Sequence, residues 1–246
     1  MKGEKLSALY GIWPHKLGLC GPEKKSAKEV LYQFLQGREK NQAKVRKILE
    51  GFEAAFSYYR LIARANNIED PFDEKVVRAY WVGNDLLEKV KIANLREMIV
   101  RDFSKPGLLP KEIAKKKARE IPENALCHHS FHVLILGSVT GKVPYQLKYL
   151  DFCRIGWGRI IKISNLKSQM SKLIVKYRPL VENKVLKLGK LVEKEILWDR
   201  TITPQIKVGD WVSFHWNNLV EKLSEKDIEN LEKYTKLTLK ILTQGH

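Results

Sequence analysis

The chain has 246 residues, of which 44% are hydrophobic and 30% are charged, and it carries a formal net charge of +17. This composition is typical of a soluble globular protein and excludes a disordered chain. Three cysteines without a C-x-x-C pair give no disulfide framework and no zinc ribbon.

The basic excess is shared by residues 1–150 and 151–246, so it does not form one basic tail. The lysine-rich run 111–119 contains no aromatic side chain on which a base could stack, which disfavours nucleic-acid binding. Attraction to an acidic protein partner remains open. Abundant lysine, glutamate and isoleucine is also typical of thermophile proteins.

The predicted cellular location rests on two features that the sequence lacks. Residues 1–5 lack the apolar region of a secretory signal, and the apolar stretch 131–139 is far shorter than the roughly 20 residues that cross a bilayer. We therefore expect a cytoplasmic protein with reduced thiols and no membrane association.

The first 150 residues predict a helical domain. Segment 10–22 is rich in glycine and proline, which favours a non-helical lead-in that packs on the helices. Apolar residues then recur at helical spacing, and the residues from Asp70 to Asp73 supply a cap and a proline for a helix start. The segments predicted as helices are 45–63, 76–90, 93–103 and 110–120.

After residue 150 the pattern alternates, with β-branched residues, and predicts strands. The predicted strands are 155–163, 172–177, 185–188, 191–198 and 211–215, with breaks at Ser164-Asn165, Arg178-Pro179, Asn183 and Thr203-Pro204. A capping box from Ser224 to Asp227 starts a final helix. The sequence therefore predicts an α+β protein: a helical domain over residues 1–150, then a small OB-like β-barrel with a C-terminal helix over residues 151–246.

Two residues of the C-terminal part carry candidate metal chemistry. Alternation in the strand 211–215 puts Val212 and Phe214 on one face, so His215 turns away from the barrel if those two fill it. Cys153 is expected at the start of the first strand, where Arg154 lowers its pKa. A thiolate beside an imidazole suits a soft metal such as iron. The alternative for each is a buried structural residue.

The order of residues in this part resembles that of a known family. A cysteine is followed by a glycine, a basic and a β-branched residue, then by a Val-Gly-Asp-aromatic-Val stretch, a histidine and a leucine at the helix start. The matching positions are Cys153, Gly158, Arg159, Ile160, 208–212, His215 and Leu223. Residues 152–242 thus resemble the small HypC/HupF-type chaperones of [NiFe]-hydrogenase assembly.

The resemblance implies that Cys153, near His215, holds an Fe(CN)₂CO fragment for a hydrogenase large-subunit precursor or a maturation scaffold, with no turnover of its own. Partner-binding residues are then Arg154, Trp157, Arg159, Trp211 and Trp216. The sequence departs from the family because Cys153 is internal rather than N-terminal, and because the helical domain has no counterpart there. The whole chain also resembles an uncharacterised group of two-domain proteins.

A second cluster lies upstream, where Cys127, His128, His129 and His132 fall within six residues. On a helix, His128 and His132 share one face and can reach a common metal. No H-E-x-x-H pattern is present. The cluster leaves a metal-dependent enzyme open as an alternative function, beside an OB-type nucleic-acid binder and a purely structural turn. If the segment folds over the barrel, it joins Cys153 and His215. Cys20 is either a further member or a buried turn residue.

Overall fold

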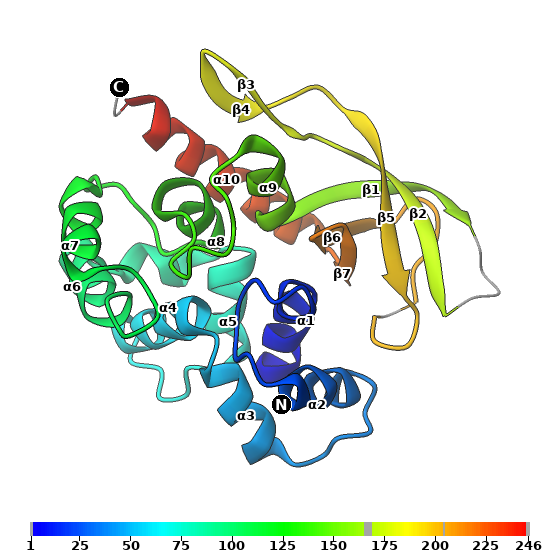
Figure 1. The fold of residues 1–246 in the computed structure, drawn as a ribbon. Helices are drawn as coiled ribbons and strands as arrows, with labels where there is room; N and C mark the ends of the chain where they lie inside the picture. The colour runs from blue at the N-terminus through cyan, green and yellow to red at the C-terminus, as the bar shows by residue number, and fades with distance from the viewer. Residues whose placement is uncertain (1, 165–168, 204, 245–246) are drawn as a thin grey trace.

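The computed structural model describes residues 2–164, 169–203 and 205–244, so the predicted breaks at Asn165 and Pro204 fall outside the described residues. It confirms an α+β fold in which a helical region precedes a small barrel and a final helix (Figure 1). The helices are α1 (Lys2–Lys16), α2 (Lys25–Leu35), α3 (Gln42–Glu50), α4 (Glu53–Ala65), α5 (Glu74–Trp81), α6 (Ile92–Asp102), α7 (Lys111–Glu120), α8 (His129–Phe131), α9 (Leu147–Cys153) and α10 (Glu225–Gln244), with a 3-10 turn η1 (Asp85–Lys89) and a π-helical turn η2 (His132–Leu136).

Helix α1 contradicts the prediction of a non-helical lead-in for residues 10–16, whereas residues 17–22 are non-helical as predicted. It includes Tyr10, Gly11 and Pro14 and is buried over most of its length. Pro14 lies in the last turn of the helix, where the missing N–H removes one main-chain hydrogen bond. Burial against α2 and α5 outweighs the low helix propensity of glycine and proline. The carbonyl of Tyr10, four residues before Pro14, consequently lacks its usual N–H donor.

Two long predicted helices are each divided. The stripe predicted over 45–63 is broken at Gly51 and Phe52 between α3 and α4. The helix predicted over 76–90 ends at Trp81, because Gly83 adopts a φ of +98° and a Cβ there would lie 2.0 Å from the Tyr234 ring. Helix α10 therefore packs closely where the second predicted helix would have continued.

The strands are β1 (Gly156–Ser164), β2 (Met170–Tyr177), β3 (Leu180–Asn183), β4 (Val185–Leu188), β5 (Val192–Asp199), β6 (Trp211–His215) and β7 (Asn218–Lys222). Five of them close in the order β1-β2-β5-β7-β6, with β5 and β7 parallel and the other described pairs antiparallel, while β3 and β4 form a separate hairpin. This five-stranded barrel confirms the predicted OB-like architecture. Strands β3 and β7 were not predicted.

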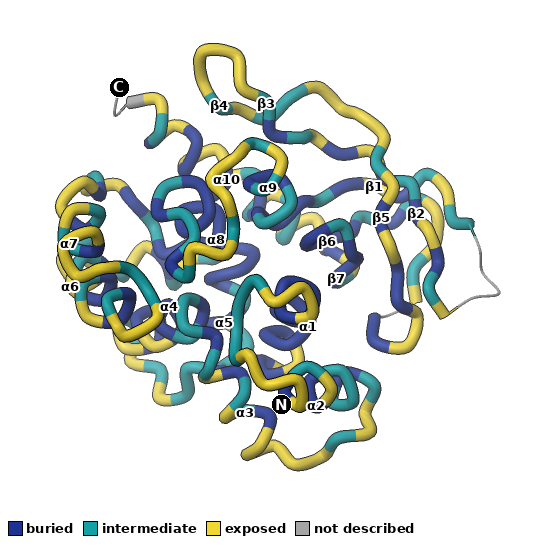
Figure 2. Tube along the Cα trace, viewed as in Figure 1, coloured by how far each residue is buried: buried dark blue, intermediate teal, exposed yellow. Residues whose placement is uncertain are grey.

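The helical region and the barrel are joined through one apolar core. That core includes Ile12, Tyr80 and Phe131 of the helical region and also Trp216 and Leu231 beyond residue 150. Figure 2 shows that α1, α8 and β6, which come from distant parts of the chain, are buried. No helix in the described ranges is long and apolar enough to cross a membrane.

Candidate metal centre

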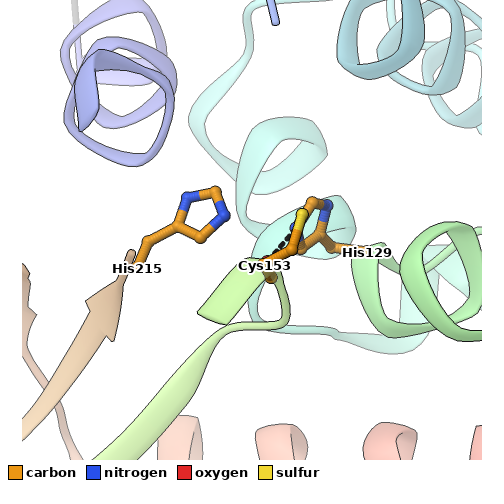
Figure 3. Close-up of side chains that lie close together, drawn as sticks. All are labelled: His129, Cys153 and His215. Atoms are coloured by element: carbon orange, nitrogen blue, oxygen red, sulfur yellow. Dashed lines mark hydrogen bonds between the residues drawn. The ribbon is translucent and has the colours of Figure 1, made fainter. Parts of the chain in front are cut away.

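Three potential metal ligands meet at the junction of the helical region and the barrel. His129 comes from α8, Cys153 is the last residue of α9 and His215 is the last residue of β6 (Figure 3). One ligand atom from each lies within 4.8 Å of the other two. Two imidazoles and a thiolate form a donor set that suits soft or borderline transition-metal ions.

The barrel and α1 together orient His215. Val212 and Phe214 belong to the barrel core, as predicted, and His215 consequently faces α1. Its Nδ1 donates to the Tyr10 carbonyl at 2.7 Å, the same carbonyl that Pro14 leaves without a helical donor. The ring is therefore in the tautomer whose lone pair is on Nε2. That atom is buried without a hydrogen-bond partner, and metal-binding histidines are commonly held in this way.

His129 is fixed from two sides. Its Nε2 donates to the Cys153 carbonyl at 2.9 Å, so the lone pair lies on Nδ1, which accepts from the Tyr80 hydroxyl at 3.0 Å. A metal bound at Nδ1 of His129 therefore replaces the hydrogen bond from the Tyr80 hydroxyl and leaves the hydrogen bond to the Cys153 carbonyl in place. That bond ties the histidine ring to the residue whose thiol is the third candidate ligand.

Cys153 differs in two respects from what the sequence predicted. It ends helix α9 and does not begin β1. Burial raises the pKa of its thiol to about 12, where Arg154 was expected to lower it. The Arg154 guanidinium instead pairs with Asp151, at 2.8 Å from Nη2 to Oδ1, and so does not favour a free thiolate. A bound metal must therefore displace the thiol proton.

A cavity of about 90 Å³ adjoins the three residues and is lined mainly by apolar side chains. It has room for a few small molecules or small metal-bound groups. Its polar lining includes Cys20, Glu53 and His132 beside the three candidate ligands. A metal at the centre would thus face a largely apolar cavity.

The other three residues of the upstream cluster do not belong to this group of ligand atoms. His128 packs on Tyr234, with ring centroids 5.5 Å apart, and its Nδ1 accepts from the Ser130 amide at 3.2 Å. His132 lines the cavity and lies against the Tyr58 ring, while Cys127 is buried in the apolar core. Burial lowers the pKa of His132 and of His215 to about 4 and that of His128 to about 3.

Tyr10 and Tyr80, which hold the two histidines, were not identified from the sequence. Tyr10 is separated from His215 by 205 positions, and no local pattern indicates the pairing. The π-helical turn η2 directly after α8 was also not predicted, although such turns are frequent at functional sites.

The residues predicted to bind a partner differ in how far they are exposed. Arg154 is 1% exposed and Trp216 is 9% exposed, so neither offers a free surface for docking. Trp216 instead lines the cavity. Trp157 and Trp211 are partly exposed and Arg159 is exposed, so their partner role stays a prediction.

Arg154 has a structural role that a mutation can test. The Asp151 carboxylate accepts from Nε and Nη2 of Arg154, from the Tyr177 hydroxyl and from the Leu180 amide. Asp151→Ala leaves the guanidinium buried without its counter-ion, and we expect a loss of about 3–5 kcal/mol in the free energy of unfolding. Urea denaturation at pH 7 measures it.

The matched control removes an acidic partner at the surface. Glu229 forms an exposed ion pair with Lys226, and Glu229→Ala is expected to change stability by less than about 0.5 kcal/mol. A similarly small effect of Asp151→Ala would show that the Asp151–Arg154 pair does not hold α9 and β3 together.

The chain belongs to a family of unknown function, DUF6390, whose model matches residues 1–245. This confirms that the whole chain is a member of an uncharacterised family. No curated protein and no solved structure matches the chain. The resemblance to HypC/HupF-type chaperones accordingly rests on the sequence positions given above.

Proposed function

We propose that this protein handles a transition metal, which it holds at His129, Cys153 and His215. The observation that carries the proposal is the convergence of these three ligand atoms within 4.8 Å. It is supported by the unpartnered Nε2 of His215 and by the main-chain carbonyls that hold the other nitrogen of each histidine.

Iron is the metal that we favour, and assembly of a metalloenzyme is the role. Cys153 and His215, the two residues on which the resemblance to HypC/HupF-type chaperones depends, are two of the three ligands. The adjoining cavity would accommodate small ligands on the iron, such as the cyanide and carbon monoxide that the resemblance implies. The client would then be a hydrogenase large-subunit precursor or a maturation scaffold, to which the protein passes its cargo.

A metal-dependent enzyme is a second candidate function. Catalytic metal sites commonly have three protein ligands and leave one coordination position for water or substrate. The cavity would supply such a position for a small substrate, with His132 in its wall as a neutral base. Turnover of a small substrate by the metal-loaded protein would distinguish this function from carriage of a cargo.

Metal analysis of anaerobically purified protein tests the proposal. We expect one equivalent of metal in the wild type, with infrared bands of metal-bound cyanide and carbon monoxide if the cargo is the iron fragment. Cys153→Ala and His215→Ala each remove about 3 kcal/mol of binding, or roughly 100-fold in Kd.

Cys127→Ala is the matched control, because Cys127 is buried away from the cavity lining, and it should retain the metal. Loss of metal from this control as readily as from Cys153→Ala would contradict the site. A wild type that binds no metal and instead binds RNA in a salt-sensitive manner would favour the nucleic-acid function.

A further inference from the structure

Cys20 lies in the wall of the same cavity as the three candidate ligands. It belongs to the turn between α1 and α2 and is flanked by Gly18 and Gly21, whose φ angles are +75° and +78°. The Cys20 carbonyl accepts a hydrogen bond from Nδ1 of His15 at 3.0 Å, and the residue contributes to the cavity lining. Cys20 is thus separated from Cys153 in sequence but lines the same cavity.

The charge of the site favours a second anion. An imidazole that binds a metal through its lone pair is neutral, so a divalent ion held by His129, His215 and one thiolate leaves a net charge of +1. An uncompensated charge in an apolar cavity is costly. Among the described residues that line the cavity, Glu53 is the single carboxylate. It is partly exposed on the first turn of α4, where water solvates it.

Sulfur is the better complement to the donors already present. A thiolate prefers the soft and borderline ions that the His₂Cys set selects, whereas a carboxylate prefers hard ions. Cys20 therefore combines the required charge, the matching chemistry and a position in the cavity wall. The Nε2 of His215, in a residue that is 1% exposed, is buried without a hydrogen-bond partner and indicates that a metal ion belongs in this space.

We propose that Cys20 is the second thiolate ligand, so that a divalent transition-metal ion is bound by Cys20, His129, Cys153 and His215. This inference rests on the proposed function and extends its ligand set. The Cys20 sulfur lies outside the group of three atoms within 4.8 Å. Binding therefore requires the Cys20 side chain to move toward the other three ligands. Each thiol loses one proton to solvent, each sulfur forms one bond to the metal, and no group is oxidised or reduced.

Cobalt(II) binding to the full-length chain tests the proposal, because thiolate-to-cobalt charge-transfer absorption grows with the number of bound thiolates. Cys20→Ser is expected to halve that absorption and to raise Kd roughly 100-fold. Cys153→Ser should do the same, and the control Cys127→Ser should match the wild type. Circular dichroism verifies that each variant is folded.

Alkylation of the wild-type protein gives a second readout that needs no variant. Cobalt should protect both Cys20 and Cys153 from iodoacetamide, as peptide mass spectrometry would show. Full absorption and unchanged Kd in Cys20→Ser, or protection of Cys153 alone, would overturn the role of Cys20 and leave the three-ligand site intact. Absence of any charge-transfer band in the wild type would overturn this inference and the proposed function together.

Discussion

Lowering the pH of the metal-free protein from 7 to 4 is expected to unfold it. The five histidines that the structure describes are all buried: His15, His128, His129, His132 and His215. Burial lowers the pKa of each ring. The folded protein is therefore held together around neutral rings that an acidic solvent will tend to charge.

The direction of this pH effect follows from how many protons the folded and the unfolded chain bind. Unfolded histidines take up protons below about pH 6.5, whereas the folded rings of His132 and His215 remain neutral down to about pH 4. The unfolded chain thus binds more protons across this window, and stability falls as the pH falls.

The expected loss of folding stability on acidification is large enough to unfold the chain. At pH 4 each ring with this pKa shift lowers the free energy of unfolding by roughly 3 kcal/mol relative to pH 7. His128, His132 and His215 together therefore lower it by roughly 10 kcal/mol, which is comparable to the whole stability of an ordinary domain. Glu221 acts in the opposite direction because burial raises its pKa, but it is a single group.

Urea denaturation between pH 7 and pH 4 measures this dependence. The control is His132→Phe, which keeps an aromatic ring between Tyr58 and Phe103 but cannot be protonated. We expect the variant to lose less stability on acidification than the wild type. A stability that stays level between pH 6.5 and pH 4 would show that the rings are protonated in the folded state and are not buried as described.

The barrel could be predicted from sequence because alternation reports which residues face a core. Strand β6 shows this clearly, since Val212 and Phe214 fill the barrel and His215 faces outward. Strand β7 was missed because its hairpin turn consists of Trp216 and Asn217, whose φ angles are +50° and +59°. Tight hairpins usually mark that conformation with an Asn-Gly or Asp-Gly pair, which is absent here.

The candidate site was predictable only in part. The resemblance identified Cys153 and His215, and the upstream cluster contained His129 among several candidates. The choice among the histidines depends on the short α8 and the π-helical turn after it, which decide that His129 and not His128 faces Cys153. Tyr10 was assigned to a non-helical lead-in, so its carbonyl could not be recognised as the partner of His215. Tertiary packing fixes these relations, and local patterns do not encode them.

Metal affinity should rise steeply with pH, whereas a preformed thiolate would give an affinity that does not change with pH. Burial raises the pKa of Cys153 to about 12, and it also raises the pKa of Cys20. Burial lowers the pKa of His215 to about 4. Near neutral pH both thiols therefore carry protons that the metal must displace, and the rings need lose none. Each displaced proton lowers Kd tenfold per pH unit.

With Cys20 and Cys153 both bound, Kd should fall about 100-fold per unit between pH 6 and pH 8, as competition with a chelator of known pH dependence would measure. Cys20→Ser should reduce this slope to tenfold, because one thiol then remains. If the wild type also shows the tenfold slope, only Cys153 ionises on binding. A Kd that does not change with pH would mean that the metal displaces no thiol proton, which would contradict binding at buried, protonated thiols.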